Sequence, residues 1–244
     1  MKIKIFTTSI LLIMIIASIV YSNSLYNHRL KYVNVDNVIN DSLIMISKDS
    51  IINYLKTFNL LKDSTKIYKI DLNKIEESLD KIKYVKKSNV HFGINSKLKI
   101  EIDERDPVIE INYLDKYLDY EGRLVPKSSF NEIKVIKLFG KIDSLKYYKL
   151  ANLGSTIMRD DFYKDHFNYI FSDSSELFIK PKKYAYTIEL GDYTMLNKKL
   201  RNYKFFYASK SNKNDLEKAK AINLKFDNQV IVEKKIIWKK TNYI

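Results

Sequence analysis

Apolar and polar residues alternate along residues 97–103, which read KLKIEID. A period of two is typical of a strand that buries one face and exposes the other. The alternation stops at the charged residues 104–106, and one of only three prolines in the chain, Pro107, follows. A proline can end a sheet here without removing an interior ladder hydrogen bond. We therefore expect a boundary between two domains at this point.

The residues before this boundary show a regular order of strand and helix patterns. An alternating segment at 31–36 predicts a first strand. Ser47 and Asp71 are suitable N-caps for two helices, each of which carries aliphatic residues along one face. Residues 86–103 then form a predicted hairpin with a short turn. The expected order is β-α-α-β-β over residues 31–105, with the aliphatic faces packed in a core.

After Pro107 the pattern changes to short strands separated by turns and interrupted by helices. Helices are predicted at 144–158 and 196–207. The expected strands lie at 108–114, 133–140, 166–172, 176–181, 185–191, 222–226 and 229–235. We predict an α+β fold with a β-α-α-β-β domain at 31–106, a mostly antiparallel β domain with flanking helices at 107–236, and a basic tail at 237–244.

The chain opens with an apolar run. Residues 5–21 carry no charge, and together with Ile3 and Lys4 they match a hydrocarbon core of about 30 Å at helical rise. A cleaved signal peptide is the alternative, because Ser22 and Ser24 offer small residues for cleavage. We predict an uncleaved single-pass transmembrane anchor at 5–21, with a cytoplasmic tail at 1–4 and a linker at 22–30. The tail is too short to fold, so the domains are expected on the far side of the membrane.

The charge of the chain narrows the possible partners. The formal net charge is +14, but the lysines are spread along the chain and interleaved with acidic residues. Nucleic-acid binding is therefore not expected, whereas attraction to anionic lipid is consistent with such a charge. The sequence contains no cysteine, which excludes thiol catalysis, disulfides and cysteine-ligated metals.

The sequence offers no pattern of catalytic or metal-binding chemistry. Its three histidines are far apart and lack metal-ligand spacing. Its five glycines form no phosphate-binding loop, and no serine lies in a G-x-S-x-G motif. The acidic pairs 76–77 and 160–161 are adjacent in sequence and do not face each other on a helix. We predict no catalytic, cofactor-binding or metal-binding residue, and hence a binding protein rather than an enzyme such as a wall hydrolase.

Five segments resemble the bacterial cell-division protein family FtsQ/DivIB. They are KYVKKSNV at 83–90, LKIEIDERDPV at 98–108, LDYEGRLVP at 118–126, IELGDYTMLNKKL at 188–200 and INLKFDNQVIV at 222–232. Their order and spacing carry the resemblance across nearly the whole chain. Two departures affect the first domain: Tyr84 stands where tryptophan is common, and the hairpin turn lacks the usual proline near Asn95.

The resemblance implies a fold and a function. The first domain resembles a POTRA domain, and the second resembles the FtsQ-type β domain. The implied protein is a non-catalytic scaffold of the divisome, in the inner membrane at the division septum, with its domains in the periplasm. Its implied partners are small coiled-coil division proteins of the FtsB and FtsL types. A POTRA-containing chaperone-like factor for outer-membrane protein assembly is the alternative, but that class needs tandem POTRA domains or a barrel.

The last predicted strand is the expected partner site. A strand at a sheet edge has unpaired N–H and C=O groups, to which a partner strand can add. In the segment QVIVEKK, Val230 and Val232 share one face and their neighbours share the other. A central core strand is the alternative. The residues predicted to bind partners are Phe226, Gln229, Val230, Ile231, Val232 and Glu233.

The charged boundary is a second site of interest. Glu104, Arg105 and Pro107 mark the predicted junction between the domains. Glu104 and Arg105 could form an ion pair that fixes the interdomain angle, worth about 0–1 kcal/mol if exposed. The resemblance implies instead that the junction positions contacts with the division machinery.

Overall fold

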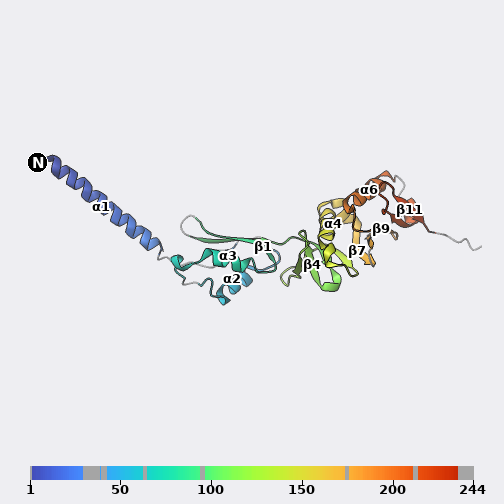
Figure 1. Cartoon of the computed structure of the whole chain (residues 1–244), viewed down its shortest axis with the longest axis horizontal. Helices are drawn as coiled ribbons and strands as arrows, with labels where there is room; N and C mark the ends of the chain where they lie inside the picture. The colour runs from blue at the N-terminus through green and yellow to red at the C-terminus, as the bar shows by residue number, and fades with distance from the viewer. Residues whose placement is uncertain are drawn as a thin grey trace, which may run out of the picture. The chain divides into compact units, whose positions relative to one another are not determined.

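The computed structural model describes residues 2–29, 39, 43–62, 65–93, 97–173, 176–210 and 214–235 (Figure 1). The chain divides into two compact units, Met1–Glu104 and Arg105–Ile244. The division falls within the charged segment that precedes Pro107 in the sequence.

The first unit begins with helix α1, Lys2–Arg29. This helix includes the predicted anchor at residues 5–21. Among the described residues, no helix was found that is both long enough and apolar enough to cross a membrane. The anchor therefore stays a prediction.

In the described part of the first unit, two α-helices, a 3-10 helix and a hairpin follow α1. Helix α2 covers Lys48–Thr57, the 3-10 helix η1 covers Ile67–Lys69, and helix α3 covers Leu72–Leu79. Both predicted N-caps are confirmed, because Ser47 Oγ accepts a hydrogen bond from Ser50 N and Asp71 Oδ1 accepts one from Lys74 N, each at 3.1 Å.

The hairpin of the first unit confirms the predicted alternation. Strands β1, Val85–Phe92, and β2, Leu98–Glu104, pair antiparallel. The aliphatic residues of β2 are buried against Ile51 and Ile75 in one core, while its charged residues face outward. The predicted strand at 31–36 lies outside the described residues; Ile39 forms a parallel bridge with Ile100.

The described residues of the second unit form a nine-stranded sheet. Its strands are β3 Pro107–Ile111, β4 Lys116–Asp119, β5 Leu124–Pro126, β6 Ile136–Phe139, β7 Phe167–Asp173, β8 Glu176–Pro181, β9 Thr187–Gly191, β10 Ala219–Asn223 and β11 Ile231–Lys234. Their order in the sheet is β11-β10-β9-β8-β7-β6-β3-β4-β5. The pairs β3–β6, β6–β7 and β9–β10 are parallel and the other pairs are antiparallel, so the sheet is mostly antiparallel, as predicted.

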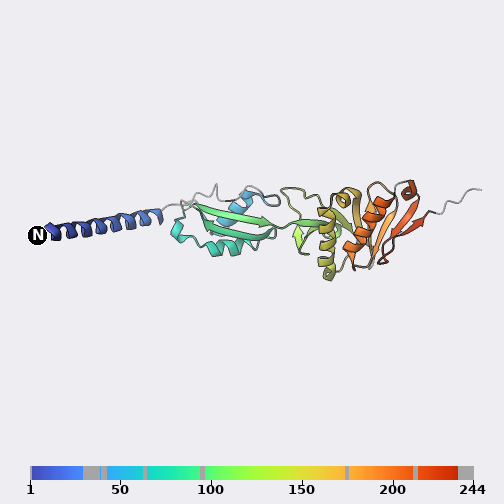
Figure 2. The ribbon, with the colours of Figure 1, turned by 90° about the horizontal axis from the view of Figure 1, so that it is seen from above.

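The helices of the second unit cover one face of this sheet (Figure 2). They are α4 Tyr147–Arg159, α5 Asp161–His166, α6 Leu196–Ser209 and the short α7 Asn214–Glu217, with 3-10 turns η3 Asn112–Leu114 and η4 Ser144–Lys146. A row of aliphatic side chains crosses the covered face from strand to strand, at Leu138, Ile170, Ile179, Ile188, Ile222 and Val232. Gly154 lets α4 approach the sheet closely, because a Cβ there would collide with Ile109.

One predicted strand is displaced. The sequence segment INLKF predicts a strand at 222–226, but β10 covers Ala219–Asn223. After Asn223 the chain turns, since Asn223 Oδ1 accepts a hydrogen bond from Lys225 N at 2.9 Å. An Asn side chain that binds the backbone two residues on favours a turn over a strand. Phe226 therefore lies in the connection between β10 and β11, and not in a strand.

Candidate partner-binding edge

Strand β11 lies at one end of the sheet. Among the described residues it has a single neighbour, β10, with which it pairs antiparallel. The segment QVIVEKK thus forms an edge strand and not a central core strand. The observed strand is shorter than predicted, because Gln229 and Val230 precede it.

The pairing with β10 decides which backbone groups point outward. The N–H of Lys235 donates to the C=O of Lys218 at 3.0 Å, so the backbone of Lys235 faces β10. Successive residues of a strand direct these groups to opposite sides. The main-chain groups of Glu233 and Ile231 therefore also face β10. The main-chain groups of Val232 and Lys234 point away from the sheet.

The side chains of this strand follow the predicted faces. Val230 and Val232 are half-buried and pack against the core of the second unit. Gln229, Ile231 and Glu233 are exposed on the other face, with Ile231 39% accessible. Within the described ranges, the edge therefore combines main-chain groups that no second strand pairs with and an exposed aliphatic side chain.

A groove lies beside this edge. It has a volume of about 420 Å³ and is lined by Asn202, Phe205, Phe206, Ser209, Asn228 and Val230. Helix α6 forms one wall and the connection between β10 and β11 forms the other. Asn202 Nδ2 donates to the C=O of Asp227 at 3.1 Å, which ties this connection to the helix.

Two exposed aromatic residues lie in the same two segments. Phe226 in the connection is 52% exposed, and Phe205 on α6 is 72% exposed. Phe226 was predicted from the sequence, but Phe205 was not. The signal for Phe205 was present, because it lies off the buried stripe of α6 at Leu196, Leu200 and Tyr203. A large apolar residue off the buried stripe of a helix is a candidate contact.

Buried hydrogen bonds hold α6 in place. The Tyr203 hydroxyl lies 2.6 Å from His166 Nε2 and 2.7 Å from the Tyr186 hydroxyl. Burial raises the pKa of both tyrosines above the ordinary value, so both hydroxyls stay neutral. His166 is buried and belongs to this network.

An ion-pair cluster fixes the turn that leads to β11. Lys225 Nζ lies 2.7 Å from Glu176 Oε2 and 3.6 Å from Glu189 Oε2. The hydrogen bond to Glu176 raises the pKa of Lys225. These contacts join the end of β10 to strands β8 and β9.

The junction residues each bind within their own unit. The carboxylate of Glu104 accepts hydrogen bonds from the backbone N–H groups of residues 44, 45 and 46. Arg105 Nη1 lies 2.9 Å from Asp119 Oδ2 and 3.5 Å from Glu121 Oε2. The expected ion pair between Glu104 and Arg105 is thus wrong, since each charge has other partners. Pro107 is the first residue of β3, where its missing N–H is tolerated.

The groups available at β11 are of the kind with which a sheet edge can bind a peptide. Within the described part of the chain, no group of three or more His, Asp or Glu side chains is placed to hold a metal. Open backbone groups, exposed aromatic residues and a groove are the means by which a sheet edge recognises a peptide.

Comparison with known protein families gives two matches. The model described as "POTRA domain, FtsQ-type" matches residues 31–105, and the model described as "FtsQ/DivIB, C-terminal related" matches residues 106–232. The second match covers more than half of the chain. A search among curated proteins found no match.

Proposed function

The chain belongs to the FtsQ/DivIB family, and from this premise we propose that it is a single-pass membrane scaffold that captures FtsB-type and FtsL-type partners by strand addition at β11. The family supports the general part of this statement, which is a non-catalytic role in the divisome and in septum formation at the inner membrane. The position of β11 at the end of the sheet supports the specific part.

The proposed contact has a backbone component and a side-chain component. A partner strand laid along β11 bonds to the main-chain groups of Val232 and Lys234, and each such bond contributes about 0.5–1.5 kcal/mol net. Side chains of the partner cover Ile231 and Phe226, and others enter the groove beside Phe205. Burial of apolar area contributes about 25 cal/mol per Å² before the costs of association.

The charge at the edge favours a partner over self-association. Lys234 and Lys235 are exposed at the end of β11. Two copies of this edge would bring their lysines together, and charged edge residues disfavour such pairing. A partner strand with a carboxylate opposite Lys234 gains attraction at the same place.

The anchor is part of the same proposal. The uncharged run at 5–21 would hold the chain in the membrane, with both units on the periplasmic side. Retention of the full-length chain, with its original N-terminus, after alkaline carbonate extraction is the expected result. A mature chain that begins near Leu25 would instead establish a cleaved signal peptide.

Proline substitutions on β11 test strand addition. Lys234→Pro removes an outward N–H from an exposed position, while Lys234→Ala removes the same charge and keeps the N–H. Lys234→Pro leaves a buried carbonyl of the partner strand without its donor, which costs about 1–3 kcal/mol. We therefore expect it to weaken capture of an FtsB-type partner by the full-length chain about ten- to hundredfold, and Lys234→Ala to change it less than about threefold. Equal binding by the two variants would refute strand addition here.

A third variant checks the register. Glu233→Pro removes a group that faces β10, so it should lower the melting temperature of the second unit. Lys234→Pro should leave that temperature within a few degrees of the unsubstituted chain. If Lys234→Pro unfolds the unit and Glu233→Pro does not, the assignment of inward and outward positions is wrong.

A further inference from the structure

A second cleft lies at the opposite end of α6 from the groove beside β11. It has a volume of about 280 Å³ and is lined by Tyr148, Lys149, Asn152, Tyr193, Met195, Leu196, Asn197 and Lys198. Leu196 and Phe205 are nine positions apart on the helix, which corresponds to about 13 Å at helical rise. The proposed function makes no use of this cleft.

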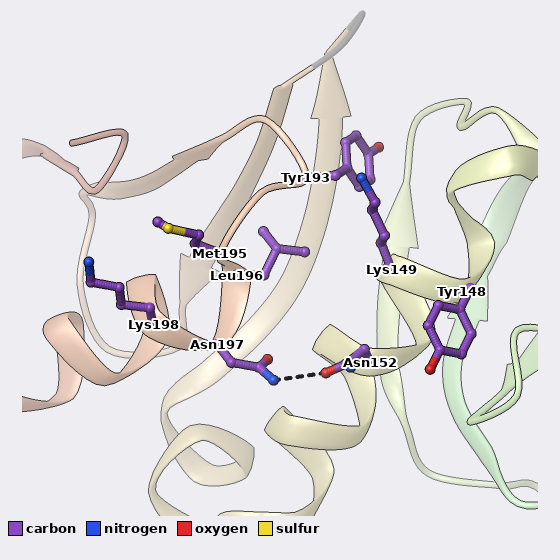
Figure 3. A pocket seen from close by; sticks show the side chains of 8 residues that line it. All are labelled: Tyr148, Lys149, Asn152, Tyr193, Met195, Leu196, Asn197 and Lys198. Carbon is purple, nitrogen blue, oxygen red and sulfur yellow. Dashed lines mark hydrogen bonds between the residues drawn. The ribbon is translucent and has the colours of Figure 1, made fainter. Parts of the chain in front are cut away.

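The two walls of the cleft come from distant parts of the sequence. Figure 3 shows the first turns of α4 on one side and the start of α6 on the other. Asn197 Nδ2 donates to Asn152 Oδ1 at 2.8 Å, and Thr156 Oγ1 donates to Asn197 Oδ1 at 2.9 Å. These bonds fix the spacing of the helices, so the cleft is held open by structure on both sides.

The floor of the cleft is apolar and its mouth presents apolar groups to water. Leu196 and Tyr193 are buried at 7% and 8% exposure. Met195 and Tyr148 are exposed, and Met195 has a φ of 49°, in the left-handed region. A non-glycine residue holds this conformation only where its surroundings impose it. Here it sets the flexible Met195 side chain at the mouth, where methionine adapts well to a bound group.

The rim of the cleft is positively charged. Lys149 and Lys198 come from opposite walls, with Leu196 between them (Figure 3). None of the eight lining residues is acidic. Asp192 lies next to Tyr193 in sequence, but it binds Lys199 Nζ at 2.9 Å and the Thr194 hydroxyl at 2.6 Å. Its negative charge is therefore matched by a lysine that does not line the cleft.

A third ammonium group adds to this charge. Lys146 Nζ lies 4.7 Å from the centre of the Tyr193 ring. The cleft thus combines an apolar floor with cations on two sides. An uncharged apolar ligand would leave the ammonium groups unmatched, and a polyanion without an apolar group would leave the floor unfilled.

We propose that this cleft docks an acidic segment of a partner protein, with one aromatic or aliphatic side chain inserted over Leu196 and a carboxylate on each side of it paired with Lys149 and Lys198. The charge complementarity of the rim and the apolar floor together define this partner. The proposal does not depend on strand addition at β11.

A designed peptide provides the probe. It carries a central phenylalanine with Glu and Asp residues on both sides and a fluorescent label, and its binding to the full-length chain in detergent is followed by anisotropy. We expect a dissociation constant between about 10 µM and 1 mM, which is typical of a short peptide in a small cleft. Lack of binding at about 1 mM would overturn the proposal.

Variants of the chain locate the site. Lys149→Glu and Lys198→Glu should each weaken binding about five- to tenfold, because each replaces an attraction with a repulsion. Lys99→Glu makes the same change of charge at an exposed position of β2 in the first unit and should have no effect beyond about twofold. If Lys99→Glu weakens binding as much as the cleft variants, the attraction is non-specific and the proposal fails.

Variants of the peptide separate the two parts of the contact. Replacing its phenylalanine with alanine should weaken binding about tenfold, and Met195→Ala in the chain about threefold. If the alanine peptide or inorganic polyphosphate binds as tightly as the probe, the cleft is a polyanion site and the proposal is wrong. Lys234→Pro on β11 should leave probe binding unchanged, so failure of one site can be told from failure of the other.

Discussion

The sheet of the second unit has two edges that are built differently. At one end, β5 has three residues and finishes at Pro126, which has no N–H to offer. The next residue, Lys127, is held by Glu110 and Asp115, each at 2.8 Å. At the other end, β11 directs the main-chain groups of Val232 and Lys234 outward. Short strands, proline and charge are the means by which sheet edges are protected, and β5 combines them more fully than β11.

The contacts that hold the segments leading into the two edge strands also differ. The turn that leads into β5 is organised by Asp119, which is 2% exposed and binds both Arg105 and the N–H groups of Glu121 and Arg123. The connection that leads into β11 is held by contacts at the surface, such as that between Asn202 and Asp227. The closed edge at β5 thus rests on buried charge, whereas the open edge at β11 keeps apolar groups accessible.

The largest effect on the free energy of unfolding is expected from removing the buried ion pair between Arg105 and Asp119, beside the closed edge at β5. Asp119→Ala leaves the Arg105 guanidinium, whose side chain is 12% exposed, without its closest carboxylate. Removal of one member of a buried ion pair costs about 3–5 kcal/mol. The free energy of unfolding of the second unit, measured by urea titration, should fall by this amount. Glu121→Ala, which removes the more distant and more exposed partner, should cost less than about 1 kcal/mol. Similar losses from both variants would contradict this account of the closed edge.

A smaller effect is expected at the open edge at β11. It changes the affinity for a partner rather than the free energy of unfolding. Phe226 near β11 and Leu124 on β5 are both exposed apolar residues, at 52% and 37%. Phe226→Ala should weaken capture of an FtsB-type partner by about 1–2 kcal/mol, or about five- to thirtyfold. Leu124→Ala is the matched control and should leave capture unchanged in the same titration. If Leu124→Ala weakens capture as much as Phe226→Ala, the two edges are not distinguished by the partner.

The sequence predicts those features that a local pattern determines. The caps at Ser47 and Asp71, the facing of β2 and the half-buried face of β11 all follow from spacing within a few residues. The end of β10 was misplaced because its small residues Ala219 and Ala221 give a weak strand pattern, while the apolar residues of the following turn continue the alternation.

Other features depend on contacts between distant residues. The outward positions of β11 follow from the bond between Lys235 and Lys218, which no periodicity reveals. The second cleft joins α4 and α6, whose contacting residues Asn152 and Asn197 are 45 positions apart. The partners of Glu104 lie 58 to 60 positions away in sequence. Adjacent opposite charges suggested a local ion pair instead, because sequence shows proximity along the chain and not in space.

The smallest expected effect is on the pH dependence of stability, and it concerns Lys127 and Lys225. Lys127 follows β5 and Lys225 lies in the connection between β10 and β11, and each pairs with two carboxylates. Hydrogen bonds raise the pKa of Lys127, with Asp115 the larger cause and Glu110 the next, and Glu176 is the main cause of the raised pKa of Lys225. A lysine whose pKa is raised on folding stabilises the fold fully below its unfolded value of 10.5 and loses that contribution as pH rises toward the folded value.

The direction of this pH dependence can be tested with urea unfolding midpoints measured at about pH 9 and about pH 11. The difference between the unsubstituted chain and Lys127→Met should shrink at the higher pH, because at pH 11 the lysine of the unfolded chain has largely lost its proton, whereas the folded chain still holds it. Lys225→Met should behave in the same way with a smaller change. Tyrosines that titrate in this range are common to all three chains, so their contribution cancels in the differences. A difference for Lys127→Met that stays constant between the two pH values would show that its ion pairs do not stabilise the closed edge, and the contrast between the two edges would then rest on backbone geometry alone.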